Sequence, residues 1–132
     1  MATQPTPHRA AQATGAGVGE IWIDPGIGFG KTVDHNLELL AGLDALVATG
    51  YPVLVGTSRK GFLGVLAAGA DKVPASASDR LPGSLATATY ALAHGAGMVR
   101  VHDVAATVQA ARLVGRPSAV TRTAGSMLDT EV

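Results

Sequence analysis

Cysteine is absent from the 132 residues, and charged residues are scarce at 15%. Without cysteine the chain has no disulfides, no thiolate metal sites and no cysteine nucleophile. The 10 basic residues balance the 10 acidic ones, so electrostatics give no reason to expect nucleic acid or an anionic membrane surface as a partner. No apolar run approaches the roughly 18 residues that span a bilayer. The first residues lack the pattern of a targeting segment, so the expected location is cytoplasmic.

Apolar residues are plentiful: 47% of the chain is hydrophobic, and 17 glycines punctuate it. A chain of this length and composition is expected to form one domain or part of one. Residues 1–18 and 116–132 show no apolar period, and both are predicted to be flexible tails. The folded part is therefore expected between residues 19 and 115.

Short apolar runs alternate with stretches of helical spacing. The predicted strands are residues 21–23, 53–56 and 98–101. Helices are predicted from Thr32 or Asp34 to Val47, from Arg59 after a Ser58 cap, from Gly83 to His94, and from Val104 to Val114. Apolar strands separated by helices are typical of a parallel sheet with right-handed crossovers. The predicted fold class is therefore α/β.

A glycine-rich loop follows the first predicted strand, with the sequence Asp24-Pro25-Gly26-Ile27-Gly28-Phe29-Gly30-Lys31. Ligands of parallel α/β folds gather at the carboxyl ends of the strands. A carboxylate there, such as that of Asp24, can accept paired N–H donors from an amino-heterocycle. The ring of Phe29 could lie against a flat ligand. The structural alternative is that Asp24 only caps the loop while the glycines turn the chain.

A second loop, Gly56-Thr57-Ser58-Arg59-Lys60, follows the second predicted strand. A hydroxyl at a helix N-terminus, beside free backbone N–H groups, can bind an anion. Lys60 could point back into the same pocket. The alternative is an ordinary serine cap followed by two solvated basic residues.

A third loop, Arg100-Val101-His102-Asp103, ends the last predicted strand. Because side chains alternate along a strand, Arg100 and His102 should face the same side. Two cationic groups at that position suit a phosphate or a pyrophosphate. The alternative is a charged strand end paired with a neighbouring carboxylate. Of the other aromatic residues, Trp22 and Phe62 are expected to pack in the core.

The three loops together, with His35-Asn36 just after the first, resemble the motifs of dihydropteroate synthases over about residues 20–115. That family folds as an eight-stranded β/α barrel. The resemblance therefore implies a partial TIM-type (β/α)8 barrel made of about the last three β/α units. It also implies the family's reaction in folate biosynthesis. In that reaction 6-hydroxymethyl-7,8-dihydropterin diphosphate condenses with p-aminobenzoate to give 7,8-dihydropteroate and pyrophosphate.

The resemblance also implies roles for individual residues. Asp24 would hydrogen-bond the pterin ring, and Phe29 would flank the ring of the p-aminobenzoate. Lys60, the expected catalytic residue, would contact the pterin and lie close to the p-aminobenzoate. Ser58 would hold the p-aminobenzoate carboxylate at a helix N-terminus. Arg100 and His102 would bind the pyrophosphate.

The family's magnesium ligand and further pterin contacts lie on its first strands, and residues 1–18 are expected to match nothing in the family. The chain is therefore expected to supply no metal ligand. It is also expected to be inactive alone, and to self-associate or pair with a complementing barrel fragment, because an open sheet exposes edges and an apolar face. A shortened gene, a split enzyme and a small homologue all remain open explanations. A non-catalytic pterin- or anion-binding fragment and a pterin-dependent methyltransferase-like domain are the alternative functions.

Overall fold

Three parallel backbone segments, which are far apart in the sequence, pair side by side in the structure. The computed structural model describes residues 6–114. Strand β1 (Leu54–Val55) pairs in parallel with β2 (Met98–Val99), with Leu54 opposite Met98. On the other edge of β1, Ile23 forms a single parallel bridge with Val53. The order across the sheet is therefore the Ile23 segment, β1 and β2, which confirms the predicted α/β class.

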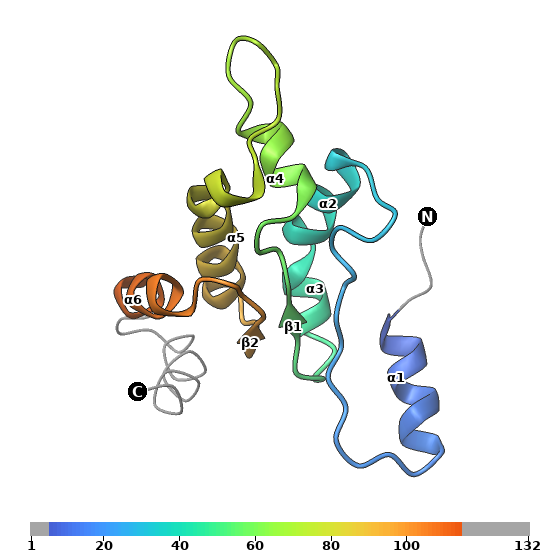
Figure 1. The fold of residues 1–132 in the computed structure, drawn as a ribbon. Coiled ribbons are helices and arrows are strands. Elements are labelled where there is room, and N and C mark those ends of the chain that lie inside the picture. Colours follow the sequence, from blue (N-terminus) through green and yellow to red (C-terminus); the bar gives the residue numbers. More distant parts are fainter. Residues whose placement is uncertain (1–5, 115–132) are drawn as a thin grey trace.

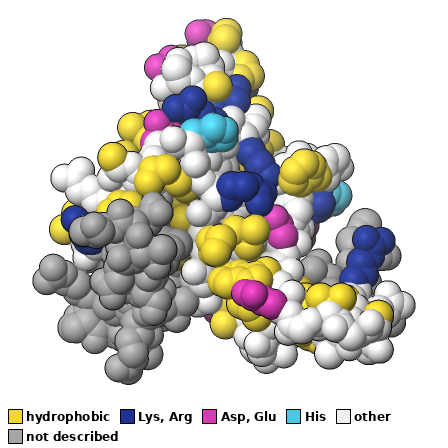
Figure 2. Space-filling model, turned by 60° about the horizontal axis from the view of Figure 1, so that its bottom comes forward, with side chains coloured by type: hydrophobic (Ala, Val, Ile, Leu, Met, Phe, Trp, Pro, Cys, Tyr) yellow, Lys and Arg dark blue, Asp and Glu magenta, His cyan; other side chains and the backbone are white. Residues whose placement is uncertain are grey.

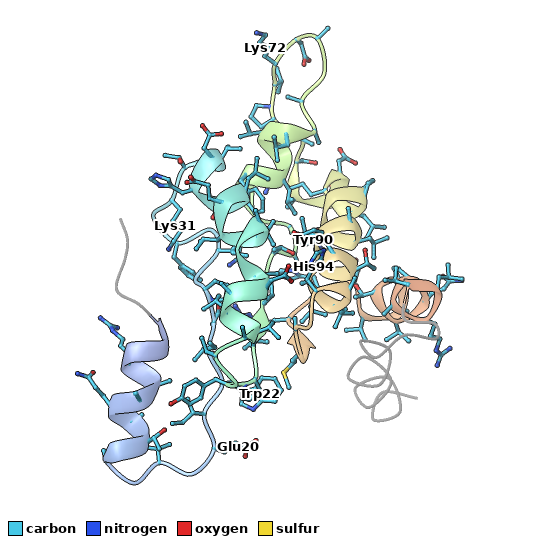
Figure 3. The ribbon with its side chains drawn as sticks, turned by 180° about the vertical axis from the view of Figure 1, so that it is seen from behind. Glu20, Trp22, Lys31, Lys72, Tyr90 and His94 are labelled. Carbon is cyan, nitrogen blue, oxygen red and sulfur yellow. The ribbon has the colours of Figure 1, made fainter. Side chains whose placement is uncertain are left out.

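Helices separate these segments, as Figure 1 shows. They are α1 (Thr6–Gly15), α2 (Val33–Ala41), α3 (Leu43–Val47), α4 (Gly61–Leu66), the 3-10 turn η1 (Ala77–Asp79), α5 (Leu81–Ala93) and α6 (Val104–Val114). A long loop projects between α4 and η1, and Lys72 lies at its tip (Figure 3). Among the described residues, no helix is both long and apolar enough to cross a membrane.

The helix that follows the first loop begins where its sequence predicts. Thr32 has an extended backbone, and its hydroxyl accepts the His35 N–H at 3.1 Å. This contact satisfies one of the backbone donors left free at the first turn of α2. The predicted single helix to Val47 is wrong, because Gly42 interrupts it and separates α2 from α3. Gly50, at φ 91°, then turns the chain towards β1.

One face of the sheet is packed and the other is not. Ile23, Val53 and Val55 are each at most 2% exposed. They belong to a core cluster that also contains side chains of α2, α3, α4 and α5, namely Leu40, Leu43, Phe62, Leu63 and Ala91. The neighbouring strand positions, whose side chains alternate to the opposite face, carry the more exposed Trp22 and Met98, at 38% and 41%. The helices therefore cover only one face of these strands.

Several boundaries differ from the sequence expectations. Residues 21–23 form only the bridge at Ile23, and the other two strands are two residues long each. Trp22 is wrongly predicted as a core residue, because it is 38% exposed and its indole donates to Glu20 at 3.4 Å (Figure 3). Phe62, at 6% exposed, is confirmed in the core.

The segment predicted to be a flexible N-terminal tail contains helix α1. Ala10 of this helix is 4% exposed and belongs to the core cluster, so part of the segment packs against the domain. Residues 1–5 and the predicted tail at 116–132 lie outside the described residues.

A surface cluster links α3 to α5. The Tyr90 and His94 rings stack with their centroids 4.1 Å apart (Figure 3). His94 Nδ1 lies 3.0 Å from Asp44 Oδ1. These contacts hold the end of α5 beside α3, on the packed side of the sheet.

Candidate functional site

The predicted site residues lie just after the carboxyl ends of the three parallel segments. Asp24 follows the Ile23 bridge, Ser58 and Lys60 follow β1, and Arg100 and His102 follow β2. Parallel pairing brings these three ends to the same edge of the sheet. One face of the molecule accordingly shows Lys and Arg side chains beside an acidic side chain and a patch of hydrophobic side chains (Figure 2).

Asp24 is shared between its own loop and the third loop. Its Oδ1 accepts the Gly26 N–H at 2.7 Å, which is a turn-forming contact. Its Oδ2 accepts a hydrogen bond from Arg100 Nη2 at 3.4 Å. Asp24 therefore caps its own loop, and Arg100 pairs with a carboxylate. Both of these structural roles are expected from the sequence as alternatives to ligand binding. Neither contact uses all the acceptor and donor capacity of the two groups, and both side chains remain partly exposed.

Lys60 points back to the first loop. Its Nζ donates to the Ile27 carbonyl and lies 4.3 Å from the centroid of the Phe29 ring. Burial lowers the pKa of Lys60, and the positive charge of Arg100 lowers it further, while Asp24 opposes the shift. Phe29 is 65% exposed. The loop thus presents an ammonium group and an accessible aromatic face together.

Gly28 makes the close approach of Lys60 possible. It has φ 88°, and a Cβ at this position would lie 2.5 Å from Lys60 Cδ. Its N–H donates at 2.7 Å to Oδ1 of Asn36, a residue of α2 that is 1% exposed. The sequence motif includes Asn36, but sequence reasoning missed its role in holding the loop. An asparagine in the first helical turn after a glycine-rich loop is a signal that could have found it, because its amide can reach back to the free backbone N–H groups of the loop.

Gly56 has a matching role beside Arg100. A Cβ at Gly56 would lie 2.5 Å from Arg100 Nη2. The guanidinium therefore crosses the end of β1 in space that only a glycine leaves free. This crossing places Arg100 beside Asp24 on the neighbouring segment.

Ser58 contacts His102 instead of capping a helix. Its Oγ lies 2.8 Å from His102 Nδ1 and accepts the His102 backbone N–H at 3.1 Å. Helix α4 begins at Gly61, with Lys60 at its N-cap position. The predicted Ser58 cap is therefore wrong, because the chain turns at Arg59 before the helix starts.

Arg59 is held from several sides, and the sequence analysis assigned it no role. It has φ 58°, which costs a non-glycine residue about 1–2 kcal/mol. Its N–H donates to Ser84 Oγ at 2.9 Å, and its carbonyl accepts from Arg80 Nη1 at 2.7 Å. Its guanidinium binds Asp103 through two hydrogen bonds of 2.9 and 3.3 Å. These contacts direct the Arg59 side chain to Asp103 and leave Ser58 and Lys60 to face the other loops.

The six predicted residues fall into two connected groups. In the first group, Asp24 pairs with Arg100 and Lys60 lies over the Phe29 ring, and the charges of Asp24 and Arg100 both act on Lys60. Ser58 and His102 form the second. The first group can offer a carboxylate, an aromatic face and cationic donors to one ligand. Within residues 6–114, no group of three or more potential ligand side chains could hold a metal ion.

A model of the pterin binding enzyme family matches residues 4–102. The expectation that residues 1–18 match nothing in that family is therefore wrong. The dihydropteroate synthase of Streptococcus pyogenes is 46% identical over 100 residues, covering 74% of this chain and 36% of that protein. The enzyme of Mycobacterium leprae is 51% identical over 106 residues, covering 79% of this chain and 37% of that protein. The chain thus spans little more than a third of the length of these curated relatives.

The similar solved structures are also dihydropteroate synthases. The structure of dihydropteroate synthase from Thermus thermophilus in complex with 6HMPPP aligns with a TM-score of 0.74 and 42% identity, over 82% of this chain and 42% of that one. The structure of the same enzyme in complex with 4-aminobenzoate aligns with a TM-score of 0.72. The Yersinia pestis enzyme aligns with a TM-score of 0.71 and 41% identity, over 81% of this chain and 42% of that one.

Proposed function

The chain belongs to the pterin binding enzyme family, and we propose that it carries the C-terminal part of a dihydropteroate synthase site. The reaction proposed for the complete site joins a pterin diphosphate to p-aminobenzoate. The arylamine nitrogen attacks the methylene carbon of the pterin, the carbon–oxygen bond to the diphosphate breaks, and the nitrogen loses a proton. The products are 7,8-dihydropteroate and pyrophosphate.

The observation that carries this proposal is the pairing of Asp24 with Arg100 at the strand ends, next to a loop from which Lys60 reaches back to Ile27 and Phe29. A carboxylate beside cationic groups suits a substrate that has an N–H-rich ring at one end and a diphosphate at the other. Asp24 accepts from the pterin, and Arg100 with His102 binds the diphosphate. The partial exposure of Asp24 and Arg100, at 33% and 52%, leaves both groups accessible to a ligand.

Lys60 and Phe29 serve the second substrate in this proposal. Lys60 is the proposed catalytic residue, because its ammonium group lies over the Phe29 ring and within the electrostatic influence of Asp24 and Arg100. The exposed Phe29 face flanks the aromatic ring of the p-aminobenzoate. The geometry gives less support to Ser58 as a carboxylate ligand, because its hydroxyl already contacts His102.

The proposed architecture is about the last three β/α units of a TIM-type barrel. The order of an Ile23 segment, β1 and β2, with helices after each, supports it. Such barrels are closed by eight strands over about 250 residues. We therefore propose that a complementing barrel fragment, or a second copy of the chain, covers the exposed sheet face. We propose that the residue holding the magnesium of the family's reaction belongs to the complementing part of the barrel, since Mg²⁺ often needs only one or two carboxylates beside substrate phosphates.

Binding of inorganic pyrophosphate by the purified 132-residue chain tests the proposal. Isothermal titration calorimetry should detect weak binding, which Arg100→Ala and His102→Ala each weaken by removing one donor to the anion. Arg112→Ala is the matched control, because Arg112 is exposed in the last turn of α6. Wild-type affinity in either site variant, or an equal loss of affinity in Arg112→Ala, would contradict the assignment.

A turnover assay tests the complete reaction. The chain alone should form no dihydropteroate from the pterin diphosphate and p-aminobenzoate, because the proposed site needs further strands. Product formation at ordinary enzyme concentrations would show that residues 1–132 suffice, and would overturn this part of the proposal.

A further inference from the structure

We propose that Ser58 is a positioning residue which holds the His102 imidazole with its Nε2–H available as a donor to a bound anion. The inference deepens the proposed function, because it rests on His102 as an anion contact. It differs from the role expected for Ser58, which was direct binding of a substrate carboxylate. Two contacts between the same pair of residues carry it.

The hydroxyl of Ser58 has one hydrogen and two acceptor lone pairs. One lone pair is used by the backbone N–H of His102, which can only donate, at 3.1 Å. Ser58 as a whole is 6% exposed, and within the described residues the other partner of its hydroxyl is His102 Nδ1 at 2.8 Å. A buried hydroxyl hydrogen without an acceptor costs about 1–3 kcal/mol.

These constraints select the tautomer of the neutral ring. If Nδ1 accepts the Ser58 hydrogen, every polar group of the pair is satisfied and the ring hydrogen lies on Nε2. If Nδ1 instead carried the hydrogen, the Ser58 hydroxyl would lose its acceptor. When the ring is protonated, Nδ1–H donates to the second lone pair of Ser58, and Nε2 still carries its hydrogen. His102 therefore offers an N–H donor to an anion in both charge states.

The neighbouring residues keep this geometry in place. Arg59 and Asp103, each one residue further along the chain, form a double hydrogen bond of 2.9 and 3.3 Å. Two adjacent pairs, Ser58 with His102 and Arg59 with Asp103, thus tie the loop after β1 to the loop after β2. The backbone bond from Arg59 to Ser84 anchors the first of these loops to α5.

A spectroscopic experiment without ligand tests the positioning role. Protein labelled with nitrogen-15 in histidine is studied by long-range proton–nitrogen correlation at alkaline pH. The His102 signals are assigned from their loss in His102→Ala. His102 should have the Nε2–H tautomer, and Ser58→Ala should move its Nδ1 resonance away from that of a hydrogen-bond acceptor. Ser76→Ala, an exposed serine in the projecting loop, should leave it unchanged. The proposal would be overturned if the ring hydrogen of His102 lay on Nδ1, or if Ser58→Ala left the Nδ1 resonance unchanged.

A double-mutant cycle on pyrophosphate affinity tests the consequence for binding. Ser58→Ala should weaken binding of inorganic pyrophosphate roughly 2- to 10-fold, the range for one lost hydrogen bond. Ser58→Ala should have no further effect on the weaker affinity of a His102→Ala background, which is measured at low salt. An equal loss in both backgrounds, or a loss of p-aminobenzoate binding alone, would show a direct contact and overturn the inference. If the wild-type chain binds no pyrophosphate, the proposed function fails, while the nitrogen-15 experiment still decides the role of Ser58.

Discussion

Arg59 and Asp103 join the two loops through both oxygens of one carboxylate. The hydrogen bonds from Arg59 are the main reason that the pKa of Asp103 lies below its ordinary value. The charged form of Asp103 is therefore favoured in the folded state. Because both side chains are partly exposed, at 39% and 29%, solvent and salt weaken the pair.

This shift gives a pH prediction at the residue scale. Because the folded pKa of Asp103 is depressed, the stability it contributes is fully present above the ordinary carboxyl pKa. That contribution is lost as the pH falls through the folded value. The difference in unfolding free energy between the wild type and Asp103→Asn should therefore shrink over that acidic range. Urea denaturation at a series of pH values measures this difference. The difference in unfolding free energy between the wild type and Arg59→Gln should shrink over the same pH range. A difference that stays constant down to the lowest pH would contradict the prediction.

The residue types of the site could be predicted from the sequence, but several of their partners could not. Asp24, Phe29, Lys60 and Arg100 belong to loops that follow predicted strands, and the structure pairs Asp24 with Arg100 and Lys60 with Phe29. The contact between Ser58 and His102 joins residues 44 positions apart. Such contacts depend on the register of β1 and β2, which local patterns do not encode.

Helix starts are the most predictable features at the element scale. Thr32 before α2 has a side-chain oxygen that can accept a first-turn N–H, and it does so. Helix α6 runs from Val104 to Val114 as its apolar spacing predicts. The start of α4 was misplaced, because Arg59 adopts φ 58° and delays the helix to Gly61. That conformation is supported by Ser84 and Arg80 of a distant segment, so local propensity could not indicate it.

The cap of α2 supplies a prediction for this element. Thr32→Ala should lower the free energy of unfolding by about 1 kcal/mol, because the His35 N–H loses its acceptor. Thr32→Ser keeps the oxygen and should stay close to the wild type. Chemical denaturation of the three proteins provides the measurement. Equal stabilities for the alanine and serine variants would show that the cap contributes nothing.

At the scale of the whole molecule, the sheet is covered on one side only. Ile23, Val53 and Val55 are buried, whereas Trp22 and Met98 on the other face are 38% and 41% exposed. Apolar area left in water is a driving force for association. Short parallel strands also have free edges that other strands can pair with.

The exposed face should therefore drive association of the isolated chain. Light scattering across a range of concentrations should show species larger than the monomer, and Trp22→Ser combined with Met98→Ser should reduce them. Leu113→Ser is the control, because Leu113 is 80% exposed on α6, away from the sheet. A wild-type chain that stays monomeric throughout would refute this role for the face.

The sequence by itself determined the α/β class, the order of the three parallel segments, the family and the residue types at the strand ends. It could do so because apolar spacing, caps and short loop motifs are local properties of the chain. Only the tertiary structure decided that Ser58 turns to His102, that Arg59 binds Asp103, and that Asn36 holds the Gly28 loop. These contacts follow from parallel register and from the packing of helices on one face, which bring together residues that are distant in the chain.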